Sequence, residues 1–235
     1  MFKSVALGVL VLMLAACGAP RPRHAGPQTP DESAWPENLR IPGRIYRVDA
    51  GQSELRVLVY RAGPLAHFGH NHVVVNRALR GEVKIADAAS GFWLSVPAAA
   101  FVVDDASARR EEGSGFDTEV PDDAKAGTLQ NMLGAAVLNA AEFPAITVNG
   151  VAMSSRQDAP PLGTMTVTVV IKIAGHESII SVPFALQSDS GRIAATGSME
   201  LRQTELGLVP YSLMLGALHV QDAMTVKFKI IAAPR

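Results

Sequence analysis

The 235-residue chain contains one cysteine, few aromatic residues and no excess of charge of either sign. A single cysteine excludes an internal disulfide, so packing alone must hold the folded part together. The 21 basic and 22 acidic residues nearly cancel, whereas a nucleic-acid-binding protein normally carries a basic patch or stripe. These shortages argue against a disulfide-stabilised scaffold and against a nucleic-acid partner.

Recognisable catalytic motifs are missing as well. The sequence has no phosphate-cradling glycine-rich loop, no zinc-protease helix motif and no nucleophile elbow. The sole cysteine has a different predicted role, described next. We therefore expect a protein that is not an enzyme.

The longest apolar run is too short to cross a membrane and has the features of a secretion signal. Lys3 precedes an apolar run over residues 5–16, while a membrane-spanning helix needs about 20 apolar residues. The run ends in Leu-Ala-Ala-Cys at residues 14–17, which looks like a lipobox. In proteins with a lipobox the cysteine is lipidated and the leader is removed just before it. We therefore predict a signal peptide over residues 1–16 and lipidation at Cys17.

The lipid at Cys17 would anchor the chain to a bacterial membrane. Each buried CH₂ of an acyl chain such as palmitate contributes about 0.8 kcal/mol, so two or three chains anchor firmly. Gly18 follows the cysteine where an Asp would favour the inner membrane, so the outer membrane is expected, with the domain facing the periplasm. Residues 17–42, rich in Pro, Gly and charge, are predicted to be a flexible tether to a domain over residues 43–235. The alternative is an ordinary cleaved signal with a chance cysteine.

Beyond the tether, apolar and polar residues alternate with a period of two, which is typical of β-strands with one face towards an apolar interior. The clearest examples are residues 55–59, 165–173, 180–186, 193–201 and 224–230. Turn signals separate them, among them Asn149-Gly150, Ala174-Gly175 and Ser190-Gly191. Residues 128–140 have helical spacing instead, after a long polar loop over residues 104–125. We expect an all-β domain of about eight antiparallel strands with one inserted helix, either a sandwich or a barrel.

Three stretches in order resemble the YceI-like family of periplasmic lipid-binding proteins. Residues 46–53 are similar to its opening Y-x-x-D-x-x-x-S, and residues 131–146 resemble its L-x-x-x-x-F-x-x-x-x-x-P-x-I region. Residues 205–222 resemble its last hairpin. The resemblance implies a lipocalin-like antiparallel β-barrel whose apolar interior binds a polyisoprenoid or an isoprenoid quinone without catalysis.

A long isoprenoid tail can be held by burial of apolar surface alone, at about 25 cal/mol per Å². The expected ligand contacts are inward-facing strand positions, and plain core packing is the alternative role for each. These candidate positions are Val57, Val167, Val169, Ile171, Val226 and Phe228.

A histidine cluster, His67, His70 and His72, allows a second interpretation. Neutral imidazoles are ligands for zinc, copper or nickel, so these three could form the site of a periplasmic metal-binding protein. The opposite view is that they hydrogen-bond the barrel mouth or the local backbone. A third possibility is an envelope interaction module whose barrel is filled and serves as a scaffold.

Overall fold

The computed structural model describes residues 43–86, 89–153 and 163–235, all within one compact unit, Trp35–Arg235. The predicted signal peptide over residues 1–16, Cys17 and the tether over residues 17–42 lie outside the described residues. None of the helices in the described ranges has the length and apolar character needed to cross a bilayer.

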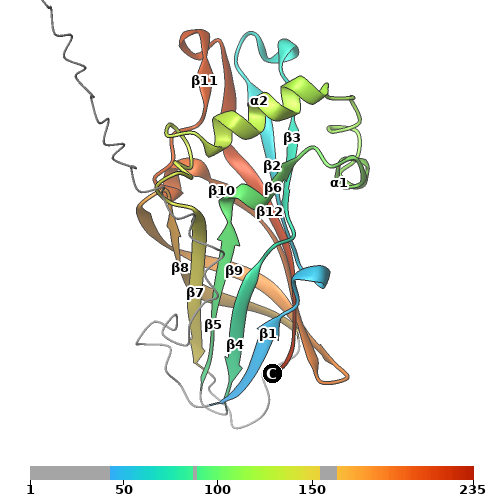
Figure 1. The fold of residues 1–235 in the computed structure, drawn as a ribbon, viewed down its shortest axis with the longest axis vertical. Coiled ribbons are helices and arrows are strands. Elements are labelled where there is room, and N and C mark those ends of the chain that lie inside the picture. The colour runs from blue at the N-terminus through green and yellow to red at the C-terminus, as the bar shows by residue number, and fades with distance from the viewer. Residues whose placement is uncertain (1–42, 87–88, 154–162) are drawn as a thin grey trace, which may run out of the picture. The chain divides into compact units, whose positions relative to one another are not determined.

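The described chain is mostly strand (Figure 1). Twelve strands are present: β1 (Arg44–Val48), β2 (Glu54–Ala62), β3 (His72–Asn76), β4 (Arg80–Ile85), β5 (Ala89–Pro97), β6 (Phe101–Val103), β7 (Ala145–Met153), β8 (Gly163–Ile173), β9 (His176–Asp189), β10 (Arg192–Arg202), β11 (Ser212–Leu213) and β12 (Leu218–Pro234). Two α-helices, α1 (Ala106–Glu111) and α2 (Asp122–Leu133), lie between β6 and β7.

Three pairs of consecutive strands act as single long strands with a bend between them. β1 runs into β2, β3 into β4 and β5 into β6, because the pairings β1–β4 and β4–β5 continue as β2–β3 and β3–β6. With β7, β8, β9, β10 and β12 these make a closed barrel of eight antiparallel strands in chain order, in which β12 pairs with β10 and with β1 and β2. The predicted all-β barrel of about eight strands is confirmed.

Two tight hairpins set the register on one side of the barrel. Ala174-Gly175 joins β8 to β9, and Ser190-Gly191 joins β9 to β10. All four residues have positive φ, between 49° and 81°, as two-residue turns require if they are to follow the twist of the flanking strands. Asn149-Gly150, predicted as a turn, lies inside β7 instead.

The single helix predicted over residues 128–140 is wrong in number and in bounds. α2 begins earlier, where Asp122 and Asp123 place negative charge in its first turn, and it ends at Leu133 with Gly134 as its C-cap. Residues 135–142 continue as turns, although Leu138 among them is buried in the core. The apolar spacing therefore continues beyond the end of the helix. The predicted polar loop contains α1, whose N-terminus is capped by Asp105 accepting a hydrogen bond from the Ala108 N–H.

Candidate functional site

The pairing register determines which side chains point into the barrel. On the wall made by β2 and β12, Val226 pairs with Val57, and Phe228 pairs with Leu55. All of these belong to the main apolar cluster or pack against it, so this face is the inner one.

On the opposite run of strands, β8 presents Val167, Val169 and Ile171 on its inner face, the face that carries the buried Ile173. All six predicted ligand-contact residues thus face inwards. Their contact with a ligand stays a prediction.

The inner face is almost entirely apolar. The polar or charged residues of the described strands whose register points inwards are His72, Asn76, Ser90 and Ser178, with Arg44, Arg61, His176 and Ser188 at or next to strand ends. The charged residues with this register, Arg44 and Arg61, lie at or next to strand ends, and among the paired residues of the described strands the middle of the inner face has no Asp, Glu, Lys or Arg. An interior of this kind fits an apolar occupant and excludes a charged one.

The middle of the interior keeps accessible surface, whereas the strand ends are closely packed. Along β12, Val226 and Phe228 are half-buried, although Met224 before them and Ile230 after them are buried. β10 repeats this pattern on its inward face: Ala195, Gly197 and Met199 are half-buried, whereas Ile193 and Leu201 near its two ends are buried. In β9 every inward residue from Ser178 to Leu186 is half-buried. β8 is packed more tightly, with Val167 and Val169 buried.

Two glycines keep aromatic rings against the barrel wall. A Cβ built on Gly197 would collide with the ring of Phe228, its partner across the β10–β12 ladder. A Cβ on Gly150 would lie 3.0 Å from the ring of Phe92, its partner across the β5–β7 ladder. Each ring therefore packs against a glycine, which has no side chain, and this leaves more room in the barrel interior.

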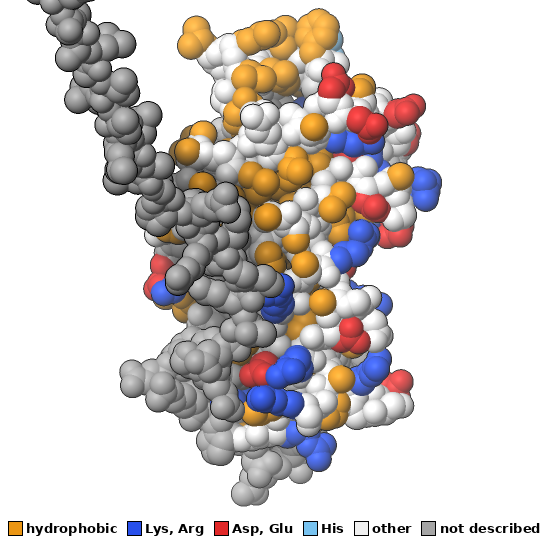
Figure 2. All heavy atoms as spheres, in the orientation of Figure 1, with side chains coloured by type: hydrophobic (Ala, Val, Ile, Leu, Met, Phe, Trp, Pro, Cys, Tyr) orange, Lys and Arg blue, Asp and Glu red, His pale blue; other side chains and the backbone are white. Residues whose placement is uncertain are grey.

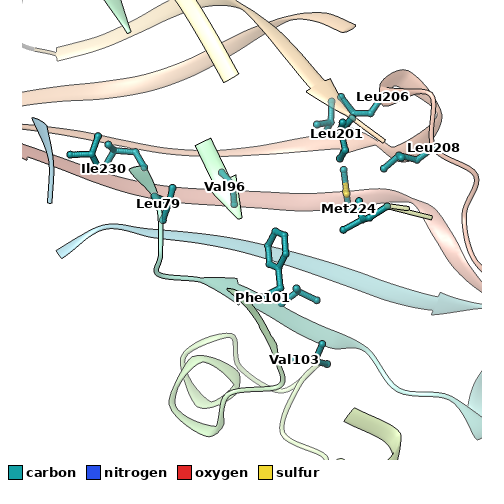
Figure 3. Packing of buried hydrophobic residues seen from close by; sticks show 13 residues of the cluster. Leu79, Val96, Phe101, Val103, Leu201, Leu206, Leu208, Met224 and Ile230 are labelled. Carbon is teal, nitrogen blue, oxygen red and sulfur yellow. The ribbon is translucent and has the colours of Figure 1, made fainter. Parts of the chain in front are cut away.

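Packed side chains close both ends of the interior. Figure 3 shows Leu201, Leu206, Leu208 and Met224 together at one end of the main cluster, with Ile230 towards the other. At the end near the C-terminus a second cluster is formed by Tyr46, Ile193 and Ala232.

α2 lies across the opposite end (Figure 1). It packs Leu129, Met132 and Leu133 against the main cluster, yet no residue of α2 is fully buried. This helix is thus a partly buried cover of the interior.

A charged network lies beneath α2. The Asp104 carboxylate is fully buried and contacts His72 Nδ1 at 2.6 Å and Arg109 Nη1 at 2.5 Å. Burial opposes ionisation of Asp104, but hydrogen bonds from His72 and from the Val73 N–H hold the pKa of Asp104 below its usual range. The other ring nitrogen of His72 has only a 3.4 Å contact with the Thr128 hydroxyl of α2. That distance is long for a hydrogen bond, so the group does not form a tight hydroxyl–imidazole–carboxylate relay.

A match along nearly the whole barrel identifies the family of this chain. A family model described as YceI-like domain matches residues 46–232. The chain belongs to the YceI-like domain family. No curated protein matches it in sequence.

Solved structures agree in fold. The crystal structure of BcnA from Burkholderia cenocepacia is 14% identical, with a TM-score of 0.54 over 78% of this chain and 98% of that one. A polyisoprenoid binding domain from Saccharophagus degradans, implicated in plant cell wall breakdown, is 13% identical, with a TM-score of 0.54 over 81% of this chain and 98% of the other. The barrel accounts for nearly all of both neighbours.

The structure places the three predicted metal ligands, His67, His70 and His72, in different surroundings, and metal binding by them stays a prediction. Across residues 43–86, 89–153 and 163–235, no group of three or more His, Cys, Asp and Glu side chains is arranged to hold a metal ion. The short 3₁₀ turn Ala66–Phe68 leaves His67 exposed, with its ring against Phe68. His72 is paired with Asp104, and its ring centroid is 6.1 Å from that of His70. Burial and then the neighbouring His72 lower the pKa of His70.

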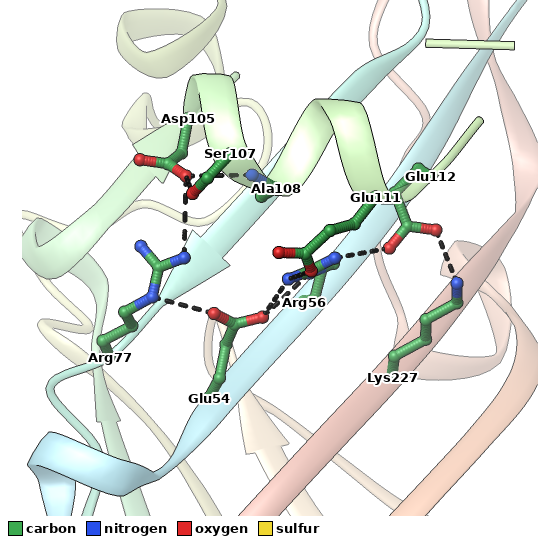
Figure 4. A network of polar contacts seen from close by, with 9 residues as sticks. All are labelled: Glu54, Arg56, Arg77, Asp105, Ser107, Ala108, Glu111, Glu112 and Lys227. Atoms are coloured by element: carbon green, nitrogen blue, oxygen red, sulfur yellow. Dashed lines mark hydrogen bonds and ion pairs between the residues drawn. The ribbon is translucent and has the colours of Figure 1, made fainter. Parts of the chain in front are cut away.

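A second charged network holds α1 on the outside of the barrel (Figure 4). Arg56 contacts Glu54 at 2.6 Å and Glu112 at 2.7 Å, and Glu112 also contacts Lys227 at 2.5 Å. Burial opposes the charge on Arg56, but its carboxylate partners raise its pKa. The run Arg109 to Glu112, which lies in the segment predicted to be a long polar loop, is therefore partly buried and structural.

Sequence reasoning missed the buried trio of His72, Asp104 and Arg109. Asp104 and Arg109 were visible only as polar residues of a long loop. The backbone of Asp104 has φ 56°, a left-handed conformation that Asp tolerates better than most residues. No pattern in the sequence indicates either the left-handed conformation of Asp104 or its burial.

Proposed function

We propose that this YceI-like domain binds a long apolar lipid of the polyisoprenoid or isoprenoid-quinone type inside its barrel, without catalysis. The observation that carries the proposal is an apolar inner face whose middle keeps accessible surface between two packed ends. The polyisoprenoid-binding domain of Saccharophagus degradans has the same fold, which supports this class of ligand.

The energetics favour a long tail over a small ligand. Each buried CH₂ contributes about 0.8 kcal/mol, while association costs about 4–15 kcal/mol in lost freedom of motion. Several isoprene units are therefore needed before burial exceeds that cost. Because the middle of the inner face carries no charged side chain among the described strands, the affinity must come from this burial.

A polar head group would lie at the α2 end of the barrel. Asn76 is already occupied, because its side chain donates to the Pro97 carbonyl and accepts from the Ala78 N–H. His72 has one ring nitrogen bonded to Asp104 and the other in only a long contact with Thr128. His72 is thus an inward polar group with capacity to hydrogen-bond a head group.

The proposed location is the bacterial envelope. The leader over residues 1–16, the lipobox cysteine Cys17 and Gly18 support an outer-membrane lipoprotein whose domain faces the periplasm. Such an anchor would hold the barrel beside a source of apolar lipid.

The test is to identify what the purified protein carries. The segment Trp35–Arg235, made in the native host, is extracted with organic solvent, and its lipids are quantified by mass spectrometry. We expect a polyprenyl species at a near-equal molar ratio. Protein that is folded but free of lipid would contradict the proposal and favour a filled scaffold.

A matched pair of variants separates interior binding from surface adsorption. Val57→Phe adds volume on the half-buried inner face, and Val102→Phe makes the same change at an exposed outer position. Overpacking costs about 1–3 kcal/mol, which corresponds to roughly 5- to 150-fold weaker binding. Lipid content should fall in Val57→Phe alone. An equal loss in both variants, or in neither, would refute the interior site.

A further inference from the structure

Two loops join into one projection at the α2 end of the barrel (Figure 1). The first, residues 61–71, is the end of β2 with its connection to β3, and the second, residues 211–219, contains β11, the turn Met214–Gly216 and the start of β12. The Leu65 N–H donates to the Ala217 carbonyl at 2.9 Å, and β11 pairs with the start of β12. We call this projection the apolar tip.

The apolar tip exposes four large hydrophobic side chains. Leu215 is 109% exposed, Met214 is 71% exposed, Phe68 is 69% exposed and Leu213 is 43% exposed. Figure 2 shows hydrophobic side chains gathered at this end of the molecule. Scattered exposed apolar residues are ordinary, but several on adjoining loop ends mark an interaction surface.

The backbone holds two of these side chains outwards at a cost. Met214 has φ 49° and Leu215 has φ 56°, left-handed conformations that non-glycine residues rarely adopt. Gly or Asn would fit this turn with less strain. A strained turn that keeps exposed apolar residues, although Gly or Asn would relieve the strain, indicates that the exposure of these side chains has a function.

The charge of the apolar tip favours lipid over protein as its occupant. Neither loop contains Asp or Glu, although the chain has 22 acidic residues, and the two loops carry Arg61 and three histidines. Such a surface meets no repulsion from anionic lipid head groups. A stable protein interface uses about 20–30 residues on each partner, far more than four side chains on a projection.

We propose that the apolar tip inserts into the surface of a lipid bilayer and docks the α2 end of the barrel against it. Exposed Leu, Met and Phe side chains enter the boundary between head groups and acyl chains, while Arg61 and the histidines stay among the head groups. The proposal concerns the outside of the barrel and does not depend on a ligand inside it.

The test uses fluorescence at the tip. The segment Trp35–Arg235 lacks cysteine, so Leu215→Cys carries a unique thiol for an environment-sensitive NBD label. Vesicles of phosphatidylethanolamine and phosphatidylglycerol should shift its emission to the blue, and nitroxide-labelled lipids should quench it. Ser190→Cys, in the β9–β10 hairpin at the opposite end, is the control and should show neither effect. An unchanged Leu215→Cys spectrum, or equal changes at both positions, would overturn the proposal.

Vesicle sedimentation gives an independent measure. Because each large apolar side chain removed from water is worth about a factor of ten or more in binding, Leu215→Asp should weaken vesicle binding at least about tenfold. Ile179→Asp is the matched control, since Ile179 is 69% exposed but lies outside the apolar tip. Equal weakening in both, or tip-dependent dimers without vesicles, would refute membrane docking. Lipid extracted from the same samples reports separately on the barrel interior.

Discussion

Replacing Asp104 by Asn tests whether the buried ion pair beneath α2 organises this end of the barrel. The fully buried carboxylate contacts Arg109 at 2.5 Å and His72 at 2.6 Å and accepts from the Val73 N–H at 2.9 Å. Asn has the same size and tolerates the left-handed backbone at this position. Asp104→Asn therefore removes the negative charge and changes little else.

The magnitude follows from the fate of Arg109. Removing one partner of a buried ion pair costs about 3–5 kcal/mol, because the remaining charge is left uncompensated. Arg109 keeps hydrogen bonds to the carbonyls of Asn71 and Thr118, so we expect the lower end of that range. A loss of about 3 kcal/mol lowers the melting temperature of a domain of this size by roughly 6–12 °C.

Urea unfolding of Trp35–Arg235 at several pH values measures this effect. Because the pKa of Asp104 is lowered in the folded state, its contribution is complete above the unfolded value of about 3.9 and is lost as pH falls through the folded value. The gap between wild type and Asp104→Asn should shrink below about pH 4. Asp105→Asn, the control, keeps an N-cap acceptor for α1 and loses only the partly exposed ion pair with Arg77, so it should cost less than about 1 kcal/mol. A loss below 1 kcal/mol for Asp104→Asn at pH 7 would refute this reasoning.

Two further predictions concern the barrel wall. Gly197→Ala places a methyl group against the Phe228 ring and should lower the free energy of unfolding by about 1–3 kcal/mol. Adding Phe228→Leu should recover part of it; a neutral Gly197→Ala would contradict the packing described. Burial opposes ionisation of Glu112, but Lys227 and Arg56 lower its pKa, so its contribution is full above the unfolded value of about 4.3 and lost in acid. Glu112→Gln should destabilise at pH 7 more than near pH 3 in urea unfolding, and a pH-independent loss would argue against the network.

The strands could be predicted because alternation is a local property. In β8 the inward residues Val167, Val169 and Ile171 alternate with Thr166 and Thr168, and a strand with one buried face needs nothing else. The hairpins at Ala174-Gly175 and Ser190-Gly191 are local in the same way. The helix failed because the buried Leu138, in a turn after Gly134, continues the same apolar spacing as α2.

The candidate site was predictable only in part. Alternation along each strand placed all six candidate positions on the inner face. No local pattern distinguished Val226, which is half-buried, from Val169, which is buried. That difference depends on which side chains lie across the barrel. The three histidines looked equivalent in sequence, yet one faces inwards against Asp104 and another lies exposed on a 3₁₀ turn.

The sequence by itself determined the all-β class and the inward and outward faces of its strands, because these depend on short-range alternation. Its ordered motifs indicated the family, and the barrel followed only from that resemblance. Only the tertiary structure decided how the barrel is packed. Whether a ring lies over Gly197, whether Asp104 meets Arg109 beneath α2, and whether two loops meet as an apolar tip all depend on closure of the sheet. Closure brings together residues far apart in the chain, and local patterns carry no record of such contacts.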